Sequence, residues 1–325
     1  SPIVAAKING EVRDIQSEYD HDDEISFIEL NTSLGWRIYQ RSILFLFIVA
    51  VSNMNKEAEV VAKFTVNKGL YCEVKIPGKP INAHLIHDIE QEMREMIASN
   101  TPIVKHSIPR QEAIELFQAH GKRGKAALIA SLPHSMISIY TCRNYPDYLY
   151  GAMLPETKLL GQFALDVEQS GVLIRTPDEM TDGKIRTRVE QPKFGHILSE
   201  AKEWAKILEC PYISDLNQIN TEHRMGELIR ISEALQEKRI AQIADHIASH
   251  RNNIRLILIA GPSSSGKTSF AQRLQIQLRV NGLHPIMISL DDYFLNREDT
   301  PRNEKGQYDY ESIDAIDTAL FNQNM

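Results

Sequence analysis

The sequence predicts a multidomain protein that joins an α+β part to an α/β part. At 325 residues the chain is longer than one ordinary compact domain, which favours two or three domains. Its earlier part alternates short strand-like and helix-like segments, the pattern of an α+β fold. Its later part contains GPSSSGKTS, Gly261–Ser269, between an apolar run and a helical pattern. That order is typical of a parallel α/β sheet that binds a nucleotide.

Composition and charge narrow the class of protein. Hydrophobic residues make up 42% and charged residues 24% of the chain, the proportions of a folded globular protein rather than a disordered one. The formal charge of −7 argues against broad affinity for nucleic acid or for anionic membranes. A local basic patch, Lys122, Arg123 and Lys125, remains, and we expect it to form a solvated loop.

Cysteine usage and hydropathy predict a cytoplasmic protein without a membrane partner. Cys72, Cys142 and Cys210 lie far apart and form no CxxC pair, so we expect neither a disulfide framework nor a cysteine zinc site. The most apolar stretch, Ser42–Val51, has about half the length needed to span a bilayer and therefore predicts a buried helix. The first residues show no basic region followed by an apolar one, so we expect no signal peptide.

Apolar periodicity and turn residues predict the elements before residue 221. Asn9-Gly10 and the acidic stretch Tyr19–Asp23 separate strand-like runs near the start, and Gly69 predicts a turn or bulge inside the strand-like run Phe64–Ile76. The stretch Ala127–Arg175 is predicted to be mostly β. Helices are expected at Arg37–Val51, His84–Ala98 and Gln111–His120.

The later part of the chain predicts a long helix and two buried strands. Apolar residues at helical spacing from Thr221 to His250 predict an amphipathic connector helix. The apolar runs Ile254–Ala260 and His284–Leu290 predict neighbouring strands of a parallel sheet that is covered on both faces.

The run Gly261–Ser269 matches the P-loop pattern G-x-x-x-x-G-K-[ST]. Its glycines allow a tight loop whose backbone N–H groups surround a β-phosphate, and the following helix adds its positive dipole end. Lys267 is expected to reach the β- and γ-phosphates, and Thr268 to offer its hydroxyl to Mg²⁺. A chance Gly/Ser-rich turn is the alternative, which the flanking strand and helix patterns disfavour. The expected ATP-binding residues are Gly261, Ser263, Ser264, Ser265, Gly266, Lys267, Thr268 and Ser269.

Two carboxylates, Asp291 and Asp292, follow the second predicted strand. Ligands of open α/β sheets bind at the carboxyl ends of the strands, so a carboxylate here can accept a proton from a hydroxyl or help to hold magnesium. An ordinary loop pair is the alternative.

Together with the P-loop, the segment Ile288–Asp317 resembles the uridine kinase and phosphoribulokinase family. The resemblance implies catalytic roles for Lys267 and Asp291, with Asp291 acting on the substrate hydroxyl, and substrate contacts from Asp291, Tyr293 and Glu311. Glu311 stands where that family usually has Asp, which changes the expected grip on the ribose. The family's later strands and its lid have no counterpart before Met325, so we expect the sequence to be a fragment.

The earlier part resembles the amino-terminal part of threonyl-tRNA synthetases, through KINGEVRD, EISFIEL, GLYCEV and DYLYGAMLP. The resemblance implies a partial TGS-like β-grasp at residues 1–34 and an editing-like α+β domain at residues 35–220. Residues 221–325 then hold the linker helix and the first part of a P-loop kinase domain. The first half of the β-grasp fold has no counterpart.

Editing in those synthetases uses an HxxxH pair on a helix and a Cys and a His in a later loop. The matching positions here are Arg41, Phe45, Leu149 and Met153, which neither bind zinc nor activate water. We therefore expect no zinc and no hydrolase activity. The remaining histidines His84, His87 and His134 show no combined ligand spacing.

These observations lead to two functional hypotheses. The first is ATP-dependent, Mg²⁺-dependent phosphorylation of a nucleoside hydroxyl, with a uridine-like nucleoside as the partner. The alternative is a nucleotide-dependent RNA- or protein-binding module that contains a degenerate editing domain. The sequence leaves the acceptor and the oligomeric state open.

Overall fold

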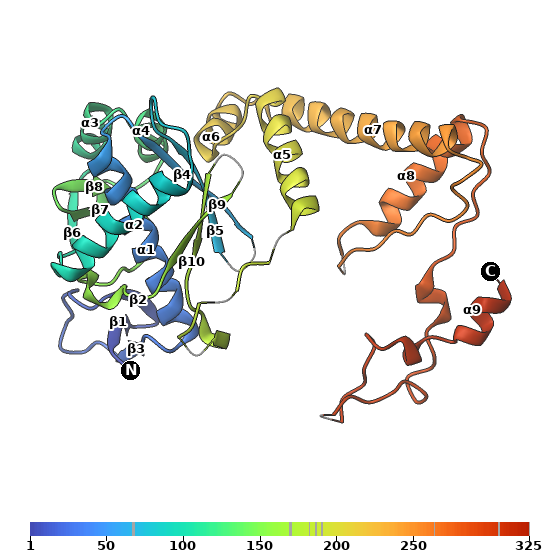
Figure 1. The fold of residues 1–325 in the computed structure, drawn as a ribbon, viewed down its shortest axis with the longest axis horizontal. Helices are drawn as coiled ribbons and strands as arrows, with labels where there is room; N and C mark the ends of the chain where they lie inside the picture. Colours follow the sequence, from blue (N-terminus) through green and yellow to red (C-terminus); the bar gives the residue numbers. More distant parts are fainter. Residues whose placement is uncertain are drawn as a thin grey trace. The chain divides into compact units, whose positions relative to one another are not determined.

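The computed structural model of the chain describes residues 1–66, 69–168, 171–181, 183–185, 187–189, 191–262, 264–304 and 306–324. These residues form two compact units, Ser1–His223 and Arg224–Met325, called unit 1 and unit 2 below. The described part contains three antiparallel sheets and nine α-helices (Figure 1), which confirms the mixed multidomain class. The boundaries expected near residues 34 and 220 stay predictions.

The chain begins with a three-stranded sheet of order β2-β1-β3, formed by β1 (Ile3–Ile8), β2 (Glu11–Asp14) and β3 (Ile25–Glu29). Asn9 and Gly10 join the first two strands at φ 48° and 87°. Two successive positive φ values are those of a tight hairpin turn, and Asn-Gly is the pair that adopts them most readily. The predicted hairpin is confirmed.

Helix α1 (Ser33–Met54) is the centre of unit 1. Its N-cap Thr32 accepts a hydrogen bond from Gly35 N, which satisfies one of the free N–H groups of the first turn. Every residue of Ser42–Val51 is buried, as expected. Among the described residues α1 is the one helix long and apolar enough to cross a membrane, and 67% of its most apolar stretch is buried inside the protein. That burial is the property of a core helix.

The main core lies between α1, α2 (Ala83–Ala98) and the strands around them. A four-stranded antiparallel sheet has the order β4-β5-β10-β9. α1 and α2 pack on each other, α1 contacts β4, and α2 contacts β9. The helices predicted at Arg37–Val51 and His84–Ala98 are confirmed. The stretch Ala127–Arg175, predicted to be mostly β, begins in a helix, and its strands are separated by long irregular segments. The predicted run from residue 64 to 76 is two paired strands, and the connection at residues 67–68 lies outside the described residues. The strands are β4 (Glu59–Val66), β5 (Gly69–Lys75), β9 (Ala164–Glu168) and β10 (Gly171–Arg175).

The third sheet has the order β6-β7-β8, with β6 (Val104–Pro109), β7 (Met136–Cys142) and β8 (Tyr145–Asp147). Helices α3 (Arg110–Ala119) and α4 (Arg123–Ala130) form a second apolar core with it.

The basic patch lies at the start of α4, so the prediction of a solvated loop there was wrong. Lys122 is the N-cap of that helix, and its ammonium donates to Ala58 O at 3.0 Å. Lys125 forms an ion pair with Asp147, whose side chain is 1% exposed. Lysine stems pack against apolar surface while their ammonium groups find polar partners, and a charge count along the sequence does not reveal those partners.

Two further helices, α5 (Pro192–Ile207) and α6 (Ile213–Thr221), complete unit 1. Lys202 of α5 donates to Glu73 of β5 at 2.7 Å, and Lys63 lies 3.6 Å from the same carboxylate. Although burial acts to raise the pKa of Glu73, the two ammonium groups outweigh it and hold that pKa below its usual value. The ion pair between Lys202 and Glu73 attaches α5 to the four-stranded sheet.

In unit 2 the helices α7 (Met225–Ser249) and α8 (Lys267–Val280) lie parallel. Glu237 accepts hydrogen bonds from Arg273 and Gln277, and Asp245 accepts one from Asn281, so contacts advance along both helices in the same direction. The segment between the end of α7 and the start of α8 therefore runs back along the helix pair. Their apolar contact is formed by Ile240, Ala244, Ile247, Leu274 and Leu278.

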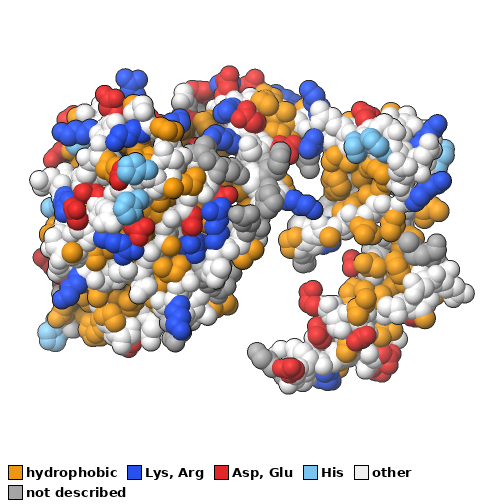
Figure 2. Space-filling view, viewed as in Figure 1, with side chains coloured by type: hydrophobic (Ala, Val, Ile, Leu, Met, Phe, Trp, Pro, Cys, Tyr) orange, Lys and Arg blue, Asp and Glu red, His pale blue; other side chains and the backbone are white. Residues whose placement is uncertain are grey.

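The two predicted strands of unit 2 are not strands in the structure. Ile254 and Ile259 of the first run pack on the helix pair, but Leu258 is 83% exposed, and Ile286 of the second run is 88% exposed. A strand requires a neighbour to complete its hydrogen-bond ladder, and neither run has one among the described residues. Hydrophobic side chains therefore remain on the surface of this unit (Figure 2).

Candidate functional site

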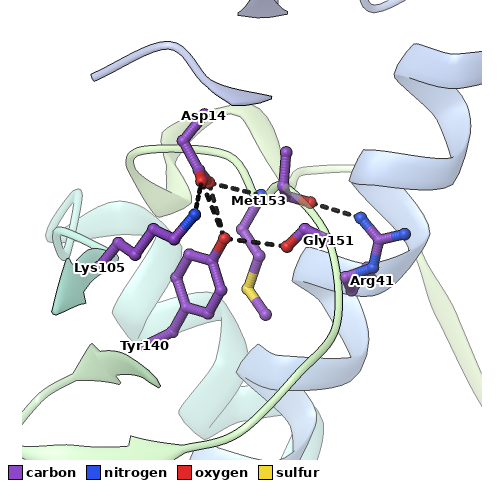
Figure 3. A network of polar contacts seen from close by, with 7 residues as sticks. Asp14, Arg41, Lys105, Tyr140, Gly151 and Met153 are labelled. Carbon is purple, nitrogen blue, oxygen red and sulfur yellow. Dashed lines mark hydrogen bonds and ion pairs between the residues drawn. The ribbon is translucent and has the colours of Figure 1, made fainter. Parts of the chain in front are cut away.

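A buried polar network links three parts of unit 1 around Asp14, the last residue of β2 (Figure 3). The Asp14 carboxylate, 8% exposed as a residue, accepts hydrogen bonds from Lys105 Nζ at 2.8 Å and from Met153 N at 2.9 Å. The Tyr140 hydroxyl lies 2.9 and 3.0 Å from its two oxygens. A buried carboxylate with a cation and two further donors is satisfied, which removes the main cost of placing it in the interior.

Tyr140 extends this network to the loop after β8. Its hydroxyl also lies 2.9 Å from Gly151 O. Burial raises the pKa of Tyr140 far above its usual range, and the negative charge of Asp14 raises it further. The phenol therefore stays protonated and acts as a hydrogen-bond donor, not as a base.

Arg41 approaches the same loop from α1 (Figure 3). Its Nη1 donates to Ala152 O at 2.5 Å. Burial lowers the pKa of this guanidinium, while the negative charge of Asp14 opposes that shift. Gly151 has φ 96°, a backbone conformation that favours glycine, and a Cβ there would lie 2.8 Å from Arg41 Cζ, so the guanidinium would have to shift.

The positions expected to correspond to the hydrolytic cluster do come together, but as core and structural polar contacts. Phe45 and Met153 are 0% and 1% exposed, and Leu149 packs against the main core. Among the described residues no three His, Cys, Asp or Glu side chains are placed to share a metal ion. The hollow beside the network is small. It is lined by Asp14, Ile15, Gln16, Ile103, Lys105, Tyr140, Met153, Leu154 and Pro155.

The end of β8, just before the loop, contains one more charged group that sequence reasoning missed. Asp147 Oδ1 accepts a hydrogen bond from Tyr148 N at 2.7 Å and from Lys125, while no partner is described for Oδ2. Neither this pair nor the Asp14 network has a sequence signal, because their contacts join residues 11 to 139 positions apart.

The predicted ATP loop ends in the predicted helix. Gly266 precedes α8 with φ 85°, a backbone conformation that favours glycine. A Cβ at Gly261 would lie 2.8 Å from Ser265 Oγ, so that hydroxyl would have to shift. Lys267 Nζ donates to Gly261 O at 2.7 Å and to Pro262 O at 2.9 Å, which points the ammonium into the loop. Ser264, Ser265, Thr268 and Ser269 are exposed, and Ser263 lies outside the described residues.

The predicted acceptor residues lie on a segment that folds back on itself. Asp291 and Asp292 are exposed in a short 3₁₀ turn, Leu290–Tyr293, where Ser289 Oγ accepts from Asp291 N. Tyr293 O accepts a hydrogen bond from Asp317 N at 2.8 Å, which brings Tyr293 beside the end of the segment. The Glu311 N–H donates to Asp309 Oδ1. Within the described part, no contact joins Asp291 to Glu311 or to the loop around Lys267.

About half of the chain is similar to curated threonine–tRNA ligases. Over 163 residues, 50% of the chain, it is 26% identical to the enzyme of Acidithiobacillus ferrooxidans, and over 162 residues it is 29% identical to that of Francisella tularensis subsp. novicida. A longer match, 27% over 208 residues or 62% of the chain, is to the enzyme of Clostridioides difficile. No family model matches the chain.

These matches define the class of module but not the whole protein. The chain covers only 25% to 32% of the length of these relatives. It contains a threonyl-tRNA-synthetase-like module, as the sequence resemblance implied. The kinase resemblance receives no support from them and stays a hypothesis.

We predict that unit 1 holds no structural zinc, because Arg41, Phe45, Leu149 and Met153 present no imidazole or thiolate to a metal. Elemental analysis of the whole chain after dialysis against EDTA is expected to find far less than one zinc per chain. One zinc per chain that survives this treatment, and that a Met153→Leu variant lacks, would contradict the prediction.

Proposed function

We propose that this chain is a nucleotide-dependent RNA-binding protein in which the synthetase-like module binds RNA without hydrolysing it. The observation that carries the proposal concerns the positions expected for the hydrolytic cluster, next to the loop Gly151–Met153. Arg41 and the buried apolar side chains of Phe45 and Met153 stand there in place of metal ligands. The similar proteins are named threonine–tRNA ligases. We propose an RNA partner from that name together with the geometry of the loop.

The charges around the loop suit one local RNA contact. Tyr150 is 87% exposed and directly precedes Gly151, which lies close to the Arg41 guanidinium. The Lys105 side chain is 39% exposed. An exposed aromatic ring can stack an unpaired base while a neighbouring cation contacts phosphate. Elsewhere on the face shown in Figure 2, Lys and Arg alternate with Asp and Glu, which disfavours broad electrostatic binding.

The Tyr150→Ala substitution is expected to weaken binding of a single-stranded RNA 3′ end at least tenfold, because one base loses its stacking surface. Fluorescence anisotropy at fixed salt measures this change. Tyr19→Ala removes another exposed tyrosine outside this loop, 67% exposed against 87% for Tyr150, and serves as the control. Equal affinity of the wild-type and Tyr150→Ala proteins, or no detectable RNA binding, would reject the proposed site.

A second candidate function, phosphorylation of a nucleoside hydroxyl, is favoured by the Lys267 ammonium in the loop before α8. The residues fit a triphosphate. The two carbonyl groups that hold Nζ can be exchanged for phosphate oxygens, and the α8 N-terminus faces the same loop. Bound ATP would supply the phosphoryl group, with Mg²⁺ held by the Thr268 hydroxyl. Asp291 would then orient the acceptor and take its proton.

Substitutions at the two positions separate nucleotide binding from phosphoryl transfer. We expect Lys267→Ala to abolish calorimetric binding of Mg·ATP, whereas Asp291→Asn keeps ATP affinity and lowers any nucleoside phosphorylation by about a hundredfold, as for loss of a general base. Asp292→Asn is the matched neighbour. ATP affinity unchanged by Lys267→Ala would reject the loop as the site, and full transfer by both Asn variants would reject the role of these carboxylates.

A further inference from the structure

The last turn of α7 places two imidazole rings side by side. His246 and His250 are four residues apart, and their ring centroids are separated by 4.4 Å with the planes inclined by 39°. Both side chains are exposed. Residues i and i+4 share one helix face, and two histidines at this spacing are a known arrangement for binding one metal ion.

The hydrogen bonds around His250 set which ring nitrogen is free. The Ser249 hydroxyl donates to His246 O at 2.8 Å, so its oxygen presents lone pairs to the neighbouring ring. His250 Nδ1 lies 2.9 Å from His246 O and 3.0 Å from Ser249 Oγ. Since both neighbours act as acceptors, Nδ1 carries the proton and donates. Nε2 then keeps its lone pair and points to the other side of the ring.

A backbone carbonyl that holds the far nitrogen of an imidazole is the usual second contact of a metal-binding histidine, because it fixes the ring and its tautomer. No hydrogen bond is described for the ring nitrogens of His246, so this ring can turn toward the same ion. Two imidazole nitrogens on an exposed face leave the other coordination positions to water. Imidazole favours Cu²⁺, Ni²⁺ and Zn²⁺ over the harder Mg²⁺ and Ca²⁺.

We propose that His246 and His250 form a two-histidine surface site for a divalent transition-metal ion. The site belongs to unit 2 and is independent of both the RNA contact and the ATP loop. A two-ligand site with water in the remaining positions exchanges its ion readily, so it differs from the EDTA-resistant zinc that unit 1 is predicted to lack.

Titration of the full chain, free of any affinity tag, with Ni²⁺ in a calorimeter tests the proposal. We expect His250→Asn and His246→Asn each to weaken Ni²⁺ binding at least tenfold, while circular dichroism shows an unchanged helix content. The matched control is the double variant His84→Asn/His87→Asn, which removes two exposed histidines of α2 spaced by three residues and is expected to leave the affinity unchanged.

Two outcomes would overturn the proposal. One is wild-type Ni²⁺ affinity in the double variant His246→Asn/His250→Asn. The other is loss of binding in the α2 variant with retention in the α7 variants, which would move the ion to His84 and His87. Neither outcome bears on the RNA or nucleotide proposals, which are tested by other ligands at other residues.

Discussion

The buried carboxylate of Asp14 is the constraint on which the arrangement of unit 1 depends. A carboxylate at this depth must have partners, since an unpaired buried charge costs several kcal/mol. Here the partners come from β6, from β7 and from the backbone of the loop after β8. The first sheet, the third sheet and the loop can therefore adopt only positions that keep all three contacts, and the first strands share one core with α1.

The loop after β8 also bears on the proposal that the synthetase-like module does not hydrolyse a substrate. A hydrolytic site requires an open position for water beside a metal or nucleophile. At the matching positions of this chain Phe45 and Met153 are buried apolar side chains, and the Arg41 guanidinium lies close to Gly151. We therefore propose that the loop is a structural element of the module and that its exposed Tyr150 is available for binding.

Local patterns in the sequence predicted much of the fold, and long-range contacts account for most of what they missed. Helical periodicity predicted α1, α2 and α7, and Asn9-Gly10 predicted the first hairpin, because both signals depend on near neighbours. Lys105 and Tyr140 lie 91 and 126 residues from Asp14, so no local signal connects them. The runs around Leu258 and Ile286 were predicted as strands from apolarity alone, yet strand formation also requires a pairing partner.

A double-mutant cycle between Asp14 and Tyr140 tests the central claim most directly. The free energy of unfolding would be measured by urea denaturation for the wild type, Asp14→Ala, Tyr140→Phe and the double variant. If the carboxylate and the phenol hold the loop together, the cycle should give a coupling energy of about 1–3 kcal/mol. Effects that add to within about 0.5 kcal/mol would show that the two side chains act independently and would contradict the account.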